Sequence, residues 1–310
     1  MFSTPLTGIV PPLVTPLLDH DTLDAAGLER LIERVIGGGV SGLFVLGTTG
    51  EGPCLSYRLR REVISHACRC AKGRVPVLVG VTDPAVVETL SLARYAADIG
   101  AAAVVAAPPY YLSPSPGELT DYVRRLLPQI PLPLFLYNMP SLTKISFELD
   151  TVRRLTEERR ICGVKDSSGD IELFRRFCEL RTERPDWTIL IGPEERQFDA
   201  DVAGGHGGVN GGANLFPRLY VALYRAAASG DLPRARELQT IVQEVSDRLY
   251  SLGTPGTSVI KGLKCALALE GVCADGLAEP FERFGDEKRQ RIQAALVILR
   301  DKVAAAVSEA

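Results

Sequence analysis

The sequence lacks the residue groupings that usually hold a metal ion or a disulfide framework. It has only three histidines, and its seven cysteines are scattered through 310 residues without a C-x-x-C motif. Dispersed thiols in odd number are typical of reduced cysteines rather than of a disulfide-stapled domain. We therefore predict neither structural zinc nor a disulfide framework.

The sequence also lacks an excess of basic charge and a long apolar segment. Its formal net charge is −3 and its pI is about 5.8, so no overall positive field would attract nucleic acid or an anionic membrane. No apolar run reaches the roughly 20 residues that span a bilayer. Residues 1–5 contain neither the basic nor the apolar region of a secretion signal. These absences predict a cytoplasmic protein without nucleic-acid or membrane partners.

Glycine motifs that bind nucleotides are missing as well. Neither G-x-G-x-x-G nor G-x-x-x-x-G-K-[ST] occurs where a strand would pass into a helix, and the glycine spacing of segment 47–52 fits neither. An open, doubly wound parallel sheet would be expected to carry such a motif near its switch point. The absence favours a closed barrel over an open sheet.

What the sequence does contain is a regular alternation of short apolar runs with longer amphipathic segments. Continuous apolar runs are typical of strands buried on both faces, and their alternation with helices indicates a parallel sheet. Eight runs match the strand number of a (β/α)8 TIM barrel, an α/β fold. The runs span residues 8–14, 42–46, 76–81, 102–106, 133–136, 162–164, 188–191 and 207–209.

After the eighth run the pattern becomes purely helical. Segments 217–229, 232–252, 258–269 and 286–307 read as helices without strands between them. We expect residues 1–230 to form the barrel with the active site, and residues 231–310 to form an appended C-terminal helical region packed on it.

Lys165, at the end of the apolar run 161–164, is the first candidate for chemistry. A buried ammonium is costly unless it is used, and desolvation can lower the pKa of a lysine from about 10.4 toward the range that an amine nucleophile requires. Tyr137 ends the preceding run, which would place a proton-transferring phenol beside the amine. Each residue has an alternative role: Lys165 could pair with Asp166, and Tyr137 could simply plug the barrel.

Other candidates lie where the carboxyl ends of barrel strands would be. Thr48 and Thr49 could cradle a carboxylate or cap a helix. The glycine-rich run 204–212, which contains Val209 and Asn210, lets backbone approach a ligand or merely pack closely. Tyr111 follows Pro-Pro-Tyr in a stiff loop and could enter a site, an interface or the surface.

Together these segments resemble the dihydrodipicolinate synthase / N-acetylneuraminate lyase family of class I, pyruvate-dependent aldolases. The resemblance extends over nearly the whole chain. It rests on residues 8–16, 47–51, 109–111, 137–140, 163–167 and 205–214.

The resemblance implies a role for each matching residue. Lys165 matches the lysine that forms an imine with pyruvate, and Tyr137 matches the proton-transferring tyrosine. Thr48 and Tyr111 match its relay partners, with Tyr111 reaching a neighbouring subunit, and Thr48 and Thr49 match the cradle of the 2-oxo acid carboxylate. The family is typically a homotetramer built as a dimer of dimers. Its intermediate is covalent on the lysine, so the reaction needs no cofactor and no metal.

Leu142 departs from the pattern of the synthase members. They carry an arginine at this position that binds the carboxylate of aspartate semialdehyde, and a leucine cannot replace a guanidinium fork. Glu194 and Glu195 resemble the acidic loop with which the lyase branch binds sugar hydroxyls, and Ser167 suits the same task. The two glutamates could equally begin a helix, where carboxylates favour the dipole.

We therefore expect a lyase that makes or breaks a C–C bond between pyruvate and an aldehyde, with a hydroxylated 2-oxo-3-deoxy acid as the favoured substrate. The alternative is a 4-hydroxy-tetrahydrodipicolinate synthase that condenses pyruvate with aspartate semialdehyde. A third interpretation, a non-catalytic barrel that binds an oxo acid, leaves the pairing of Lys165 with Tyr137 unexplained.

Overall fold

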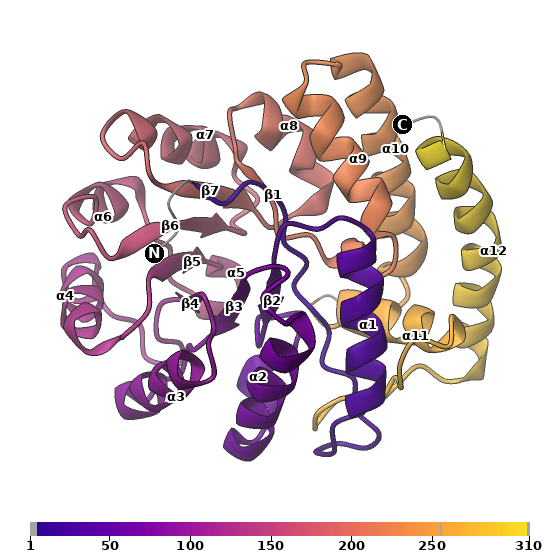
Figure 1. Ribbon diagram of the computed structural model, residues 1–310, viewed down its shortest axis with the longest axis horizontal. Helices are drawn as coiled ribbons and strands as arrows, with labels where there is room; N and C mark the ends of the chain where they lie inside the picture. The colour runs from indigo at the N-terminus through magenta and orange to yellow at the C-terminus, as the bar shows by residue number, and fades with distance from the viewer. Residues whose placement is uncertain (1–4, 255, 309–310) are drawn as a thin grey trace.

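Eight short parallel strands form a single sheet in the computed structural model, which describes residues 5–254 and 256–308. The sheet order is β1-β8-β7-β6-β5-β4-β3-β2, and a parallel bridge between Pro12 and Phe44 joins the segment after β1 to β2. The sheet therefore curls into the predicted (β/α)8 barrel (Figure 1). The strands are β1 (Gly8–Ile9), β2 (Leu43–Val45), β3 (Val77–Gly80), β4 (Ala103–Ala106), β5 (Leu134–Asn138), β6 (Ile161–Asp166), β7 (Thr188–Ile191) and β8 (Gly207–Gly208).

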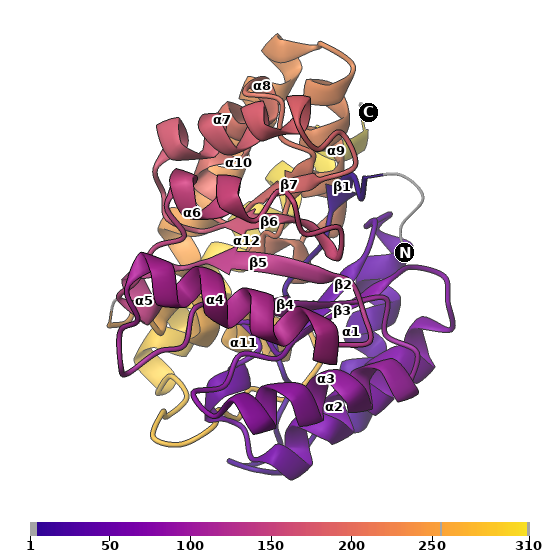
Figure 2. The same ribbon diagram turned by 90° about the vertical axis from the view of Figure 1, so that its left-hand side faces the viewer.

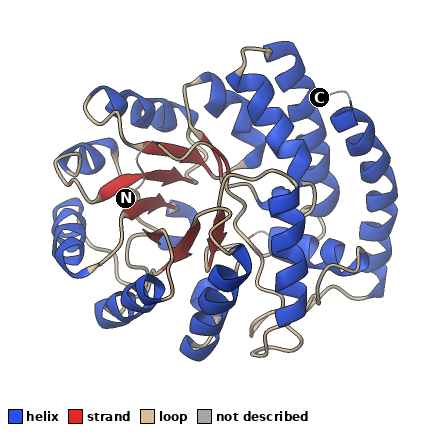
Figure 3. Cartoon of the chain, viewed as in Figure 1, coloured by secondary structure: helices blue, strands red, loops and turns tan. Residues whose placement is uncertain are grey.

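Helices surround the strands and continue past the barrel (Figure 3). Figure 2 shows α4, α6 and α7 along the outside of the strands. The α-helices are α1 (Ala25–Gly37), α2 (Tyr57–Ala71), α3 (Val86–Asp98), α4 (Pro116–Leu126), α5 (Pro140–Thr143), α6 (Leu149–Arg154), α7 (Ile171–Glu179), α8 (Gln197–Val202), α9 (Pro217–Ala228), α10 (Leu232–Leu249), α11 (Ser258–Leu269) and α12 (Asp286–Ser308).

The element positions follow the apolar pattern, with one instructive difference. Segments 188–191 and 258–269 coincide with β7 and α11. The first run, 8–14, contributes only Gly8–Ile9 to the sheet. Pro11 and Pro12 follow directly, and proline has no N–H to donate to a strand ladder.

The strand side chains divide into two apolar layers because successive residues point to opposite faces. Phe44, Phe135, Tyr137 and Val209 belong to a cluster inside the barrel. Residues such as Leu136 belong to the larger cluster between strands and helices. Tyr137 is in phase with Phe135, so its ring lies inside the barrel.

The C-terminal helices cover one side of the barrel, at the right of Figure 1. There α10 packs against α9 and α12, and α11 packs against α12. The proposed division of the chain at residue 230 stays a prediction. Within the described part of the chain, no helix combines the length and the apolarity needed to cross a bilayer.

Candidate active site

Lys165 and Tyr137 lie opposite each other on β6 and β5, as their strand-end positions suggest. The Nζ atom of Lys165 is 3.8 Å from the centroid of the Tyr137 ring and 4.9 Å from that of Phe44. Lys165 is 5% exposed and Tyr137 is 6% exposed. The structure thus brings a buried amine into contact with a phenol at the carboxyl ends of two adjacent strands.

The ammonium of Lys165 has no carboxylate partner among the salt bridges of residues 5–254 and 256–308. Asp166 points to the other face of β6, where its carboxylate accepts from Asn138 Nδ2 at 2.7 Å and from Ser168 Oγ at 2.9 Å. The alternative that Lys165 pairs with Asp166 is therefore wrong. Burial lowers the pKa of Lys165, while the phenol of Tyr137 acts in the opposite direction. The amine consequently loses its proton more easily than a lysine in water.

Thr48 provides the partner of the phenol. Its Oγ1 atom is 3.1 Å from Oη of Tyr137, within hydrogen-bonding distance. Thr48 and Thr49 are half-buried in the turn that follows β2. The amide of Glu51 donates to the carbonyl of Thr48 at 3.0 Å and so closes this turn.

A cavity of about 440 Å³ opens above these residues. Its wall includes Thr48 and the rings of Tyr137 and Phe44, and Lys165 contacts both of these rings. The rest of the wall is largely apolar. It is formed by Leu46, Gly47, Glu51, Pro53, Cys54, Gly80, Thr82, Val105, Ala107, Tyr110, Met139, Leu142, Thr143, Gly256, Thr257, Ile260 and Phe281.

Charged side chains are scarce on the described wall of this cavity. Among the described residues, no lysine, arginine or histidine lines the cavity. The carboxylate of Glu51, which does line it, is already paired with Lys264. Leu142 occupies the wall and is 47% exposed. The described wall of the cavity therefore offers no free cation to an anionic group.

Glu194 and Glu195 lie elsewhere. Glu194 accepts hydrogen bonds from Tyr220 Oη at 2.6 Å, Tyr250 Oη at 3.0 Å and the amide of Gly212 at 2.8 Å, and burial raises its pKa to about 7. Neither glutamate lines the cavity. The expected contact with substrate hydroxyls is not seen, because Tyr220, Tyr250 and Ser246 already donate hydrogen bonds to these carboxylates.

Glu195 is likewise hydrogen-bonded to a side chain of a C-terminal helix. Its carboxylate accepts from Ser246 Oγ of α10 at 2.5 Å. Both glutamates belong to a short 3-10 helix, Glu194–Arg196, so the alternative that they begin a helical turn describes them better.

The remaining predicted binding residues lie near the strand ends but off the cavity wall. Ser167 is half-buried, and its Oγ fills the space that a β-carbon on Gly192 would need. Val209 packs inside the barrel in the same cluster as Tyr137. Asn210 is fully buried against Gly208, and its amide has no hydrogen-bond partner within the described structure.

Tyr111 points into solvent rather than into the cavity of its own chain. It is 93% exposed, and its φ of 80° is unusual for a bulky residue. Its neighbour Tyr110 does line the cavity. A single chain therefore leaves the predicted relay of Thr48, Tyr137 and Tyr111 incomplete.

The residue pair that sequence reasoning missed is Glu51 with Lys264. Lys264 donates to the Glu51 carboxylate and to the carbonyl of Gly276, and the amide of Ala278 donates to Glu51 Oε2 at 2.9 Å. Glu51 stands in a recognisable motif, but nothing local to Lys264 marks it as a partner 213 residues away.

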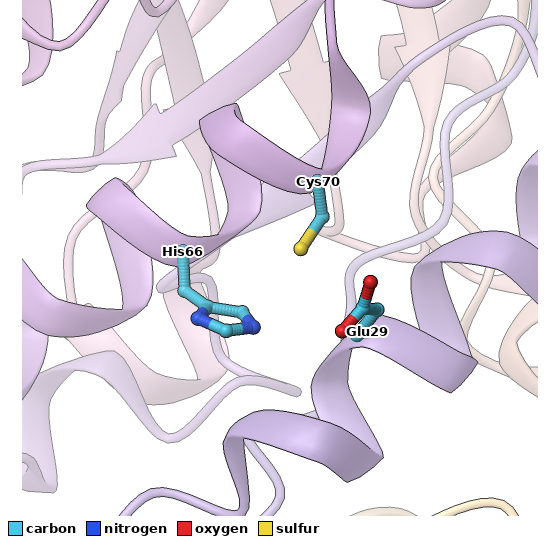
Figure 4. Close-up of side chains that lie close together, drawn as sticks. All are labelled: Glu29, His66 and Cys70. Carbon is cyan, nitrogen blue, oxygen red and sulfur yellow. The ribbon is translucent and has the colours of Figure 1, made fainter.

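Glu29, His66 and Cys70 form a separate grouping of potential metal ligands on α1 and α2 (Figure 4). Their ligand atoms lie within 4.8 Å of one another. These three residues lie on helices outside the strands, and none of them lines the cavity beside Tyr137. We therefore assign this group no part in the chemistry of the cavity.

The barrel is closed, and a buried lysine lies against a phenol at the carboxyl ends of its strands. These features define a class of barrel enzymes whose reactive group is an amine. Comparison with known proteins shows to which family within this class the chain belongs. The model of the Dihydrodipicolinate synthetase family matches residues 5–299, and the chain belongs to this family. It is accordingly a lyase, because the named members are aldolases and synthases.

Three relatives illustrate the range of the family. "Probable 2-dehydro-3-deoxy-D-pentonate aldolase YjhH" of Escherichia coli (strain K12) is 33% identical over 91% of this chain and 94% of its own. The structure of a dihydrodipicolinate synthase from Bacteroides thetaiotaomicron has a TM-score of 0.93 and 52% identity, and covers 96% of this chain and 100% of that one. YagE from E. coli K12, solved in complex with pyruvate, has a TM-score of 0.89 and 29% identity over 95% and 98% of the two chains.

Proposed function

We propose that this protein is a class I aldolase in which Lys165 forms an imine with the C2 carbonyl of pyruvate or of a pyruvate-derived 2-oxo acid. The observation that carries the proposal is the buried amine of Lys165, which contacts Tyr137 and, within the described residues, lacks a carboxylate partner. A buried amine with a lowered pKa is suited to nucleophilic attack on a carbonyl. The pyruvate bound to YagE supports this first half of the reaction.

In the cleavage direction, the neutral amine of Lys165 attacks C2, and Tyr137 donates its phenolic proton so that the carbonyl oxygen leaves as water. This step leaves an iminium and a Tyr137 phenolate. The iminium takes up the electron pair of the C3–C4 bond as that bond breaks, and the phenolate, hydrogen-bonded to Thr48, accepts the proton of the C4 hydroxyl, so C4 leaves as an aldehyde. Tyr137 then returns this proton to C3 of the enamine. Addition of water to the resulting iminium releases pyruvate and the free amine, and the remaining proton restores the phenol.

The favoured substrate is a hydroxylated 2-oxo-3-deoxy acid. The described cavity wall has no cation for a second carboxylate but does carry hydroxyls, namely those of Thr82, Thr257 and Tyr110. An uncharged, hydroxyl-bearing aldehyde fits such a wall. The name of the E. coli relative, a pentonate aldolase, points to the same substrate class.

The competing function is 4-hydroxy-tetrahydrodipicolinate synthesis. It is favoured by the likeness to the B. thetaiotaomicron protein, which is described as a dihydrodipicolinate synthase. It would require the apolar wall around Leu142 to accept the carboxylate of aspartate semialdehyde, and a carboxylate without a partner is costly to desolvate.

The proposal includes a homotetramer built as a dimer of dimers, in which Tyr111 of one subunit completes the relay of its neighbour. The exposure of Tyr111 supports this arrangement. A reducing, cytoplasmic location accords with seven cysteines that are all free. The covalent imine makes a metal or organic cofactor unnecessary.

Borohydride reduction in the presence of pyruvate tests the chemistry. We expect a stable adduct on the peptide that contains Lys165, detected by mass spectrometry, and no adduct in Lys165→Met. An unmodified Lys165 in the wild-type protein would refute the imine.

A screen of pyruvate release from 2-oxo-3-deoxy acids, run beside a coupled assay with aspartate semialdehyde, then decides the substrate. Faster turnover with aspartate semialdehyde would establish the competing function.

A further inference from the structure

Glu51 and Lys264 form an ion pair that is almost completely withheld from water. Glu51 is 2% exposed and Lys264 is fully buried. The pair joins two distant parts of the chain, since Glu51 follows β2 and Lys264 lies in α11. A buried ion pair contributes little net stability over an apolar pair of similar shape. Stability alone therefore does not explain why a buried ion pair lies beside the cavity.

The turn between β2 and η1 (Gly52–Cys54) is strained at both ends. Leu46 has a φ of 59° and Glu51 has a φ of 55°, and both lie in the left-handed region that non-glycine residues avoid. Thr48 and Thr49 lie between them. Such strain persists only where surrounding contacts hold the backbone in place, and it concentrates at functional sites.

The contacts that hold this turn are different at its two ends. Leu46 is buried in the core, and its carbonyl is so close to Gly52 that a β-carbon there would lie 2.1 Å from the oxygen. Glu51 is held through its side chain, by Lys264 and by the amide of Ala278. Thr15 Oγ1 also donates to the carbonyl of Gly50 at 2.7 Å, and the Glu51 amide donates to the carbonyl of Thr48. The carboxylate of Glu51 is thus the contact that clamps the C-terminal end of the turn to α11.

We propose that the Glu51–Lys264 pair is a positioning element of the active site, which fixes the turn so that Thr48 meets Tyr137 and the Thr48–Thr49 segment receives the carboxylate of the 2-oxo acid. The proposal rests on the proposed function for its substrate. It assigns Lys264, in a helix outside the strand–helix repeat, to the site of the reaction.

A double-variant cycle of Glu51→Gln, Lys264→Met and their combination tests the proposal. Each single variant leaves a buried charge without its partner and should lower the unfolding temperature. The double variant is neutral and should regain most of that stability. Because the turn has lost its ionic tie to α11 and the side chain at position 51 keeps only the hydrogen bond from the Ala278 amide, we expect its KM for pyruvate to stay raised by about 10-fold or more, with a smaller change in kcat.

Glu270→Gln is the matched control. Glu270 is the C-cap of α11, the helix that holds Lys264, and its carboxylate accepts from Arg300 Nε at 2.6 Å rather than from the turn after β2. We expect this variant to lower stability without changing the KM for pyruvate. A KM that recovers together with stability in the double variant would show a purely structural role and overturn the proposal.

Two further measurements keep the test decisive. Backbone hydrogen exchange of segment 46–52 should be faster in the double variant than in Glu270→Gln. This expectation depends only on the turn, so it can be tested even if the wild-type protein fails to trap pyruvate and the proposed function is wrong. If the double variant does not fold, Glu51→Asp keeps the charge but withdraws the carboxylate by one methylene. A raised KM with faster exchange in Glu51→Asp supports the clamp, and wild-type values of both contradict it.

Discussion

At the scale of single residues, the environment of Lys165 links burial to reactivity. Burial lowers the pKa of the amine, because water no longer solvates the charged form. The folded protein therefore holds more of the neutral, nucleophilic amine near neutral pH than an exposed lysine with a pKa of about 10.4 would.

This environment predicts how imine formation depends on pH. The initial rate of borohydride-trapped adduct formation with pyruvate should rise with pH as the ammonium loses its proton. It should level off below the pKa of about 10.4 that an exposed lysine shows. Trapping rates measured from about pH 6 to about pH 11 would check this. A rate that keeps rising through a pH of about 10.4 would show that Lys165 titrates as a solvated amine.

Leu142 carries the prediction about the aldehyde. Leu142→Arg places a guanidinium on the cavity wall, where it can pair with a carboxylate. We expect the ratio of kcat/KM for aspartate semialdehyde to that for the best uncharged aldehyde to increase by about 10- to 100-fold, which is the effect of one good charge pair. Leu142→Gln, of similar size but uncharged, is the control. Equal ratios in both variants would show that position 142 does not select the aldehyde.

At the scale of strands and helices, the local pattern of apolar residues predicts where elements such as β7 lie. Doubly buried strands read as continuous apolar runs, which is why β7 falls where the pattern indicates. The adjacency of Tyr137 and Lys165 also follows from strand order, since consecutive strands of a barrel are neighbours.

Contacts between distant elements could not be read in this way. The partners of Glu194 are Tyr220 in α9 and Tyr250 just after α10, and the partner of Glu51 is in α11. Such pairings depend on how the C-terminal helices dock on the barrel, and single-sequence periodicity carries no information about docking. For this reason the sequence left two roles open for the glutamates of the β7 loop, contact with substrate hydroxyls or the start of a helix, and could not show that their carboxylates are hydrogen-bonded to Tyr220, Tyr250 and Ser246.

The Glu194 contact makes a prediction about stability. The carboxyl has a pKa of about 7 in the folded protein, raised by burial above 4.5, so the folded state binds a proton that the unfolded state has released. Stability should therefore fall as pH rises from about 4.5 to about 7 and then change little. Glu194→Gln keeps the hydrogen-bonding shape without the titration. The difference in unfolding free energy between wild type and variant should shift by roughly 2–4 kcal/mol over this range, measured by urea unfolding.

Asp201 serves as the control for this measurement. Its pKa is also raised to about 7 by burial, so Asp201→Asn removes a second titration without touching Tyr220 or Tyr250. If Glu194→Gln retains the full pH dependence of the unfolding free energy and only Asp201→Asn reduces it, protonation of Glu194 does not cause that dependence and the prediction is wrong.

At the scale of the whole molecule, the relay predicted for the site is incomplete in one chain. Tyr111 is exposed and in a left-handed conformation, while Thr48 and Tyr137 already contact each other inside the barrel. Two neighbouring subunits that exchange this loop would bury the tyrosine and complete both relays. Sedimentation velocity gives the assembly state, and subunit mixing shows whether the relay crosses the interface.

The mixing experiment uses two variants that are each impaired. Lys165→Met cannot form the imine, and Tyr111→Phe should lose about 10²-fold in kcat because the relay lacks its terminal hydroxyl. In a mixed assembly, the intact Lys165 of the Tyr111→Phe subunit meets the intact Tyr111 of the Lys165→Met subunit. We expect co-refolded mixtures to exceed either variant alone by at least about 10-fold in activity. If Tyr111 acted within its own chain, every site in the mixture would carry one defect and mixing would restore nothing.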